Sequence, residues 1–263
     1  MKICVLVKEV PDAAVEKRMD PSTGRLDRSG EKNINPFDTH ALEAAVQLRE
    51  RGGEVEEIVA VTMGPDSAEK VLRKAVSLGA DRSAHLSDPA FAGSCVASTG
   101  YALAQVLKLE SPDLVLLGQQ SDDGECYTMG AIVAEYLCMP SLTQVIKMDL
   151  HEGTLRCERQ AEYGYDTVEV DLPAVISVGD AINEPRYPSL KAIMGAKKKP
   201  LDRRTLADAG IDPSRVGEAG SRTAVLAMAP PPQKPPGELI EDEDTARTVE
   251  RIVEWLDERK LLA

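Results

Sequence analysis

The stretch EIVAVTMGPDSAEKVLRKAVSLGAD, residues 57–81, decides the fold. It begins with an apolar run at 57–62 in which polar and apolar residues do not alternate, the pattern of a parallel strand buried on both faces. A Gly-Pro turn follows, and an amphipathic helical repeat then continues to Gly79. A strand, a turn and a helix in this order form one unit of an α/β fold.

The same unit recurs along the chain. The apolar runs KICVLVK (2–8) and DLVLLG (113–118) predict two more buried strands. Helical repeats occur at 39–52, 94–110 and 127–140. Strands and helices that alternate at this spacing predict a doubly wound, mostly parallel α/β sheet.

The pattern changes after Pro140. The segment TLRCERQAEYGYDTVEVDL (154–172) alternates polar and apolar residues around a Tyr-Gly-Tyr turn, so it predicts a small antiparallel hairpin. PAVISVG (173–179) predicts another buried strand.

The end of the chain reads as an extended arm. Residues 229–238 are rich in proline and predict polyproline II structure, and an amphipathic helix is expected at about 243–259. We expect an α/β domain at 1–200 and a C-terminal arm at 201–263. The arm is too poor in core residues to be packed by its own domain, so we expect a second subunit to hold it.

Composition limits the classes of partner. Lys and Arg number 31 against 44 Asp and Glu, which gives a net charge of −13. A surface this negative repels nucleic acid and anionic membranes. The five cysteines include no CxxC pair, and the amino terminus becomes charged after a few apolar residues. These features predict a cytoplasmic protein without a structural zinc or other metal site.

Three segments at predicted strand ends could bind a ligand. They are VKEVPD (7–12), TMGPDSAEK (62–70) and GQQSDDGECYTMG (118–130). An open α/β sheet binds ligands at the carboxyl ends of its strands, and helix amino termini there favour anions. Together the segments favour nucleotide binding.

Motifs for catalysis are absent from the sequence. It contains no GxGxxG after the first strand, no GxxxxGK[ST], no GxSxG and no HExxH. His40, His85 and His151 are isolated, and we interpret them as surface or capping residues. The acidic group at 122–125 could bind a metal or act as an acid–base pair, but its place before a helix favours an interaction with the helix dipole.

Taken together, these segments resemble the beta subunit of electron transfer flavoprotein. The resemblance covers essentially the whole chain. It rests on VKEVPD (7–12), NINPFDTHALEAA (33–45), residues 61–81, LLGQQSDDGE (116–125) and LPAVISVGDAINEPRYPSLKAIMGAKKKP (172–200). It implies a sheet of the adenine-nucleotide-binding type.

The resemblance implies a heterodimer with an alpha subunit that binds the redox-active FAD mainly itself. The pocket of the beta subunit would hold AMP or, in electron-bifurcating members, a second FAD. Phosphate would lie at helix amino termini near Ser67 and Tyr127, and Asn35-Pro36 could bind an adenine edge. The implied cofactor-binding residues are Leu6, Asn35, Pro36, Phe37, Asp38, Met63, Gly64, Gln120, Ser121, Asp122, Asp123, Gly124, Glu125, Cys126, Tyr127, Thr128, Met129, Gly130 and Ala131.

The resemblance also implies a docking loop at 183–200, where a leucine enters an apolar pocket on a partner dehydrogenase. The matching leucine is Leu190, and lysines 197–199 could attract acidic partners. Prolines limit the freedom of the unbound loop and so lower the entropic cost of docking. The expected docking residues are Arg186, Tyr187, Leu190, Ile193 and Met194.

The function implied is that of an electron carrier rather than a free-standing enzyme. It would accept electrons from dehydrogenases, such as the acyl-CoA dehydrogenases of fatty acid oxidation, and pass them to a quinone reductase or another acceptor. The resemblance also allows an electron-bifurcating member of the family, with a second FAD in this subunit. The alternatives are a stand-alone adenine-nucleotide-binding or ATP-hydrolysing α/β protein and a scaffold that binds no nucleotide.

Overall fold

A computed structural model describes residues 1–52, 54–227, 229, 232, 234, 236, 237, 239, 240 and 244–262. The chain divides into two units, Met1–Val225 and Leu226–Ala263. The first unit ends later than the expected boundary at residue 200, because residues 201–204 add a strand to the main sheet. The polyproline II structure expected at 229–238 lies in part outside the described residues and stays a prediction.

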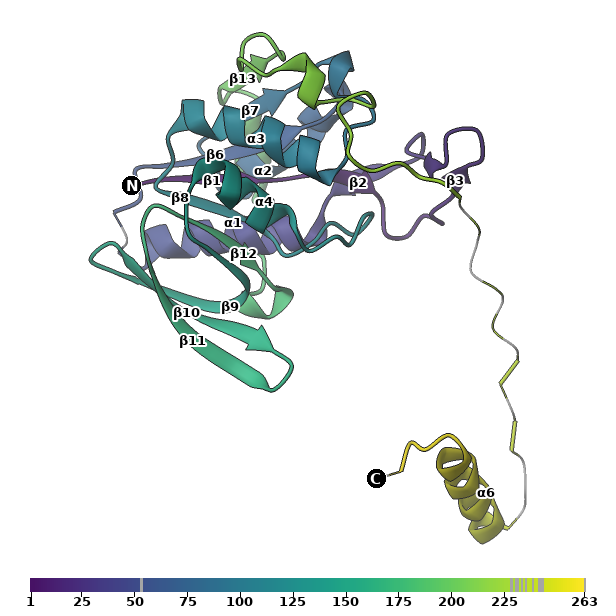
Figure 1. Cartoon of the computed structure of the whole chain (residues 1–263). Coiled ribbons are helices and arrows are strands. Elements are labelled where there is room, and N and C mark those ends of the chain that lie inside the picture. Colours follow the sequence, from purple (N-terminus) through teal and green to yellow (C-terminus); the bar gives the residue numbers. More distant parts are fainter. Residues whose placement is uncertain are drawn as a thin grey trace. The chain divides into compact units, whose positions relative to one another are not determined.

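A nine-stranded sheet forms the centre of the first unit (Figure 1). The strand order is β11-β10-β9-β12-β8-β1-β6-β7-β13. Strands β9, β12, β8, β1, β6, β7 and β13 run parallel, and β10 and β11 continue the sheet beyond β9 through antiparallel pairs. The strand bounds are β1 (Lys2–Leu6), β6 (Glu57–Met63), β7 (Arg82–Leu86), β8 (Leu114–Gly118), β9 (Ser141–His151), β10 (Thr154–Ala161), β11 (Gly164–Asp171), β12 (Ala174–Val178) and β13 (Leu201–Arg204).

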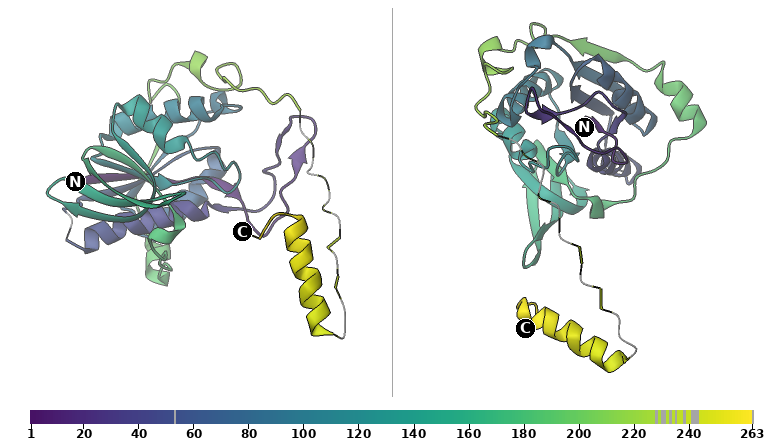
Figure 2. Two further views of the ribbon diagram at one scale, coloured as in Figure 1. Left: turned by 60° about the horizontal axis from the view of Figure 1, so that its bottom comes forward. Right: turned by 90° about the vertical axis from the view of Figure 1, so that its right-hand side faces the viewer.

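Helices cover both faces of this sheet. Those of the first unit are α1 (Pro36–Glu50), α2 (Glu69–Ser77), α3 (Val96–Glu110), α4 (Met129–Leu137) and α5 (Leu190–Ala196). Side chains of α1 and α2 pack in one apolar core, and side chains of α3 and α4 pack in another. Figure 2 shows α1 on the opposite side of the sheet from α3 and α4. The expected doubly wound, mostly parallel α/β architecture is therefore confirmed.

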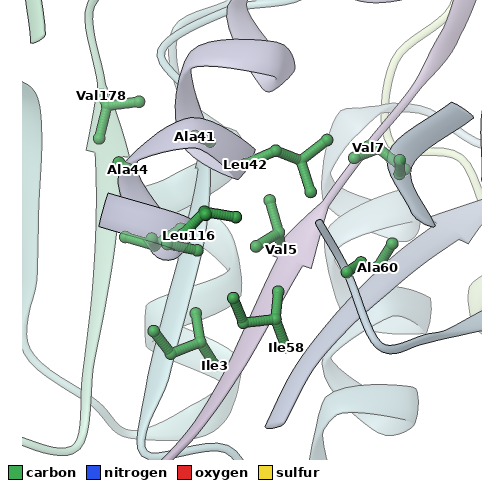
Figure 3. Packing of buried hydrophobic residues seen from close by; sticks show 14 of the residues in the cluster. Ile3, Val5, Val7, Ala41, Leu42, Ala44, Ile58, Ala60, Leu116 and Val178 are labelled. Atoms are coloured by element: carbon green, nitrogen blue, oxygen red, sulfur yellow. The ribbon is translucent and has the colours of Figure 1, made fainter. Parts of the chain in front are cut away.

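Strand β1 contributes to both cores. Ile3 and Val5 face α1, where they pack with Leu42 (Figure 3), whereas Cys4 and Leu6 belong to the core under α3. Each side chain that is fully buried in this way stabilises the fold by about 1.5–3 kcal/mol. Burial on both faces is the reason that the sequence of this strand is apolar without alternation.

The chain reverses direction across the sheet at β1. From β1 it proceeds through α1 to β6 and then through α2 to β7 on one side, and α3 returns it to β8 on the other side of β1. The connections therefore diverge at the carboxyl ends of β1 and β8. In open α/β sheets this point forms the crevice in which ligands bind.

A long connection leaves the sheet between β1 and α1. It contains two small antiparallel pairs. We call its residues 12–31 the arm, which is distinct from the C-terminal arm expected at 201–263. Short 3-10 helices lie in later connections. The bounds are β2 (Glu9–Pro11), β5 (Lys32–Ile34), β3 (Met19–Asp20), β4 (Arg25–Leu26), η1 (Asp66–Ala68), η2 (Pro89–Phe91), η3 (Asp180–Ile182) and η4 (Pro213–Arg215).

The second unit contains the helix α6 (Thr245–Glu258), which begins at the capping side chain of Asp244. The amphipathic helix expected at about 243–259 therefore forms. Val249, Ile252 and Val253 are all exposed. In the described part of the chain, no helix is long and apolar enough to cross a bilayer.

The interpretation of His85 as a surface or capping residue is wrong. His85 lies within β7 and is almost fully buried. Its Nε2 lies 3.1 Å from the carbonyl oxygen of Gly64, which accepts a hydrogen bond from the ring. The side chain therefore supports the turn after β6 from inside the sheet.

Candidate nucleotide site

A cavity of about 380 Å³ opens at the point where the connections diverge. Leu6 at the end of β1 and Leu117 and Gly118 at the end of β8 form its base. The volume is within the range of about 300–1,000 Å³ that is usual for small-molecule sites. The sheet topology therefore places a cavity of ligand size at the position where this architecture binds ligands.

Many residues expected to bind a cofactor line this cavity. They are Leu6, Asn35, Asp38, Met63, Gln120, Ser121, Gly124, Cys126, Tyr127 and Met129. The others are not among its lining residues, namely Pro36, Phe37, Gly64, Asp122, Asp123, Glu125, Thr128, Gly130 and Ala131. Ser67 is also outside the lining, and its hydroxyl is hydrogen-bonded to Lys32 and Glu9.

The remaining lining residues were not among the expected cofactor-binding residues. Val7, Lys8, Gly118 and Gln119 lie inside the candidate segments 7–12 and 118–130, and this position was the signal that could have found them. Arg28 belongs to the arm, Ser94 precedes α3 and Thr99 lies in its first turn. The full set is Val7, Lys8, Arg28, Val61, Ser94, Val96, Thr99, Leu103, Leu117, Gly118 and Gln119.

Asp38 ties the two strand ends together from the first turn of α1. Its Oδ2 accepts a hydrogen bond from the backbone N–H of Lys8 at 2.8 Å, and its Oδ1 accepts one from Gly118 at 3.2 Å. Burial raises the pKa of Asp38 to about 7, against the opposing effects of hydrogen bonds from Asn35, Lys8 and Gly118. This carboxyl group therefore fixes the base of the cavity.

Asn35, which is almost fully buried, holds the loop after β8. Its Nδ2 donates to the carbonyl oxygen of Gln120 at 2.9 Å, and its Oδ1 accepts from the N–H of Asp122 at 3.0 Å. Because both ends of the amide are used in this way, the side chain positions the loop at the edge of the cavity. Contact between Asn35 and an adenine edge stays a prediction.

Gly118 allows α1 to approach the end of β8. A Cβ atom at this position would lie 2.5 Å from Cβ of Phe37 and 2.7 Å from Oδ1 of Asp38. Real Cβ atoms do not come this close to their neighbours. Only glycine therefore permits the hydrogen bond between the strand end and the helix.

The loop at 119–128 has an unusual backbone. Glu125 and Tyr127 adopt left-handed φ angles of 46° and 55°, which cost energy for residues other than glycine. Gln120 presents a buried Oε1 that has no hydrogen-bond partner among the described residues. An acceptor left in this state costs about 1–3 kcal/mol, and an N–H or O–H of a ligand in the cavity would satisfy it.

The walls of the cavity combine apolar surfaces with a few polar groups. Met63, Leu103 and Met129 provide apolar contact, and hydroxyl groups come from Thr99 and Ser121. This combination suits a flat ring that carries hydrogen-bonding groups. Adenine with its ribose has that chemistry, so the residues present fit an adenine nucleotide.

Two acidic residues of the loop, Asp122 and Asp123, form ion pairs, and an interaction of the acidic group with the dipole of α4 stays a prediction. Lys17 of the arm donates to the Oδ2 of Asp122 at 2.9 Å, and Arg28 and Lys8 both pair with Asp123. The arm could not be paired with this loop from the sequence, because Arg28 and Asp123 are 95 residues apart.

A second candidate surface lies on the docking loop. Tyr187 and Leu190 are 94% and 80% exposed, and Met194 and Ile193 are also exposed. Ser189 caps α5 by accepting a hydrogen bond from the N–H of Ala192. A set of large apolar side chains thus projects from a short, capped helix and the turn before it.

Arg186 differs from the other expected docking residues. Its guanidinium forms hydrogen bonds with both carboxylate oxygens of Glu43 and with both of Glu50, at 2.7–3.0 Å. Both glutamates belong to α1. Arg186 therefore attaches the docking loop to the helix whose first turn borders the cavity.

A cavity of mixed polarity where the connections of a doubly wound sheet diverge is the arrangement with which α/β proteins of this class bind mononucleotides. Comparison with known proteins gives a more specific result. The family described as "Electron transfer flavoprotein domain" matches residues 23–209. By this match and by its full-length relatives, the chain belongs to the electron transfer flavoprotein family, as a beta subunit.

The relatives extend over the whole chain. It is 40% identical to an electron transfer flavoprotein subunit beta of Mycobacterium bovis, over 99% of each chain. It is 38% identical to the subunit of the same name from Thermoanaerobacterium thermosaccharolyticum, over 100% of each chain. It is also 36% identical to the caffeyl-CoA reductase-Etf complex subunit CarD of Acetobacterium woodii, again over 100% of each.

Proposed function

We propose that this chain and an alpha subunit form a heterodimer that carries electrons from dehydrogenases, such as acyl-CoA dehydrogenases, to a quinone reductase or another acceptor. The alpha subunit holds most of the redox-active FAD, whose isoalloxazine ring accepts and donates the electrons when it is bound. This chain supplies an adenine-nucleotide pocket, part of the surroundings of the flavin and a docking loop. The observation that carries the proposal is the cavity at the ends of β1 and β8 in a chain of this family.

The nucleotide in this pocket is AMP or, in a bifurcating complex, the adenine part of a second FAD. The unpaired Oε1 of Gln120 and the apolar walls suit the adenosine that both ligands share. The name of one full-length relative supports the second FAD as a candidate ligand. That relative is named as a subunit of a caffeyl-CoA reductase-Etf complex. The two ligands differ in what denaturation would release from the heterodimer.

Docking to partner dehydrogenases uses the docking loop. Leu190 is the anchor, because one large exposed apolar side chain on a restrained loop can enter a pocket at low entropic cost. Tyr187, Ile193 and Met194 surround it, and Arg186 holds the loop in place through Glu43 and Glu50. A small interface of this kind permits the rapid exchange that an electron carrier needs.

The C-terminal arm packs on the alpha subunit. The apolar stripe of α6 supports this proposal, because Val249, Ile252 and Val253 share one face of a helix and are exposed in the chain by itself.

The heterodimer works in the cytoplasm, and the five free cysteines suit a reducing compartment.

The proposal is tested with the purified heterodimer. A dehydrogenase and its substrate are added, and bleaching of the flavin absorbance is followed. We expect reduction of the flavin that depends on both subunits and on the dehydrogenase. Hydrolysis of ATP by this chain without a partner, and no reduction of the flavin by any dehydrogenase tried, would instead support the stand-alone alternative.

A further inference from the structure

Two cationic side chains and one buried carboxylate meet at the edge of the cavity. Lys8, just past β1, and Arg28, from the arm, both line it. The Nζ of Lys8 lies 2.7 Å from Oδ1 of Asp123, and Nη2 of Arg28 pairs with Oδ2 of the same residue. The Asp123 side chain is fully buried, whereas each cation is 45% exposed. Both carboxylate oxygens are therefore bound between cations that also face the cavity.

This arrangement is that of an anion site in which the protein supplies its own anion. Two cations with one carboxylate leave a local surplus of one positive charge. A phosphate monoester carries about −1.5 to −2 at neutral pH, so it would balance both cations if the carboxylate moved away. Of the five N–H donors of a guanidinium, Arg28 uses one in the hydrogen bonds of the described residues, so it can bind a larger anion.

We propose that Lys8 and Arg28 bind a phosphate group of the nucleotide, and that Asp123 takes the place of this phosphate when the cavity holds no nucleotide. The inference rests on the proposed function of the cavity. It adds the phosphate site and an exchange between the protein's carboxylate and the ligand.

The loop that carries Asp123 is built so that this residue can move without loss of the base of the cavity. Asn35 fixes the backbone at Gln120 and Asp122, immediately before it. The segment after it contains Gly124, whose backbone is conformationally permissive, and the left-handed residues Glu125 and Tyr127, which hold backbone strain. The hinge therefore lies on one side of Asp123 and the anchor on the other.

Electrostatics support competition between the carboxylate and a phosphate. Burial raises the pKa of Asp123, but Lys8, Ser121 and Arg28 outweigh burial and hold this pKa at about 2. The carboxylate is thus charged at neutral pH. It neutralises part of the charge that would otherwise attract phosphate.

The test measures binding of AMP and of adenosine to the heterodimer by calorimetry, after bound nucleotide has been removed. We expect Lys8→Gln and Arg28→Gln each to weaken AMP binding by roughly tenfold or more, because each removes a charge-assisted hydrogen bond. Adenosine, which has no phosphate, should change by less than about twofold, since it makes no such bond. Asp123→Asn should tighten AMP binding and leave adenosine binding unchanged.

The matched control is Arg18→Gln. It removes the same charge from the same arm, but Arg18 is exposed and pairs with Glu16 rather than with the loop. We expect AMP binding by this variant to equal that of the wild type. If Lys8→Gln does not fold, Arg28→Gln still tests the site, because Arg28 lies on the arm outside the core.

Two results would overturn the inference. One is AMP binding that is unchanged in Arg28→Gln and Lys8→Gln while the wild type binds both AMP and adenosine. The other is an Asp123→Asn variant that loses AMP and adenosine binding equally, since Asp123 would then only support the loop. A wild-type heterodimer that binds neither ligand would overturn the proposed function of the cavity along with the phosphate site.

Discussion

At the scale of single residues, three residues near the switch in strand order hold the base of the site in shape. Asp38 joins the ends of β1 and β8, Asn35 fixes the loop that follows β8, and Gly118 makes room for the first turn of α1. None of them needs to touch a ligand to matter. Each change at these positions should alter the shape of the cavity.

The raised pKa of Asp38 predicts a pH dependence of stability. Burial lifts this pKa to about 7 from an ordinary value of 3.8, so the folded chain binds the proton more tightly than the unfolded chain does. The stabilisation of the fold by protonated Asp38 is therefore fully present below about pH 4 and is lost as the pH rises to about 7. The loss is on the order of 4 kcal/mol at most.

Chemical unfolding of the wild type and of Asp38→Asn at a series of pH values measures this effect. Asparagine does not titrate, so the wild type should lose stability relative to the variant as the pH rises from 4 to 7. A stability difference that is constant over this range, or that changes in the opposite direction, would show that the carboxyl group is not perturbed as described.

Gly118→Ala should destabilise the first unit and close the cavity. The new methyl group would overlap Phe37 and Asp38, and overpacking of this kind costs about 1–3 kcal/mol. The measurement is the midpoint of thermal unfolding. Gly30→Ala is the control, because a Cβ atom there meets nothing within 4 Å, and it should leave the midpoint unchanged.

Residue types and spacing could predict the strand-end segments but not every side chain of the site. The segments 62–70 and 118–130 stand out through glycine, proline and small polar residues after apolar runs. Arg28 could not be found in this way, because it reaches the cavity from an exposed arm far away in the sequence. The pairing of Asp123 with two cations is likewise a tertiary feature that no local pattern records.

At the scale of elements, the docking loop, which contains α5, is attached to the first unit at both of its ends. Arg186 fixes the start of the loop to α1, and Arg73 of α2 donates to the carbonyl oxygens of Ala196 and Lys199 at its end. The segment between these attachments projects Leu190 from the surface. A fixed loop with a projecting apolar residue is suited to repeated docking.

Leu190→Ala should slow reduction of the flavin by a dehydrogenase. Truncation of an interface anchor of this kind costs about 2 kcal/mol or more, which corresponds to a loss of more than tenfold in apparent affinity. The nucleotide content of the heterodimer should not change. Tyr163→Ala is the control, because Tyr163 is equally exposed but lies in the β10–β11 turn. Loss of flavin from the Leu190 variant would argue against a docking role.

Long apolar patterns predicted elements well, whereas short or polar strands escaped prediction. The strands at 57–63 and 114–118 and the hairpin at 154–171 follow directly from periodicity. Strand β7 contains a buried serine and histidine, and β13 reads Leu-Asp-Arg-Arg. These strands form because their backbones pair with neighbouring strands, which no local residue pattern records. β13 is also an edge strand, so its side chains stay partly exposed and need not be apolar.

At the scale of the whole molecule, the chain is built to be completed by another subunit. Its single tryptophan, Trp255, lies on α6 and reports on that helix. If α6 packs on the alpha subunit, the ¹⁹F resonance of a chain labelled with 5-fluorotryptophan should shift when the heterodimer forms. An unchanged resonance in a complex that has otherwise assembled would place the contact elsewhere on the chain.

The central claim is that this chain holds an adenine nucleotide at the ends of β1 and β8, in addition to the flavin of its partner. The most direct measurement is to denature the purified heterodimer and quantify every nucleotide released. We predict one FAD with one AMP, or two FAD, per heterodimer, and loss of the second nucleotide alone in Gly118→Ala. A heterodimer that releases one FAD and no further adenine nucleotide would contradict the claim.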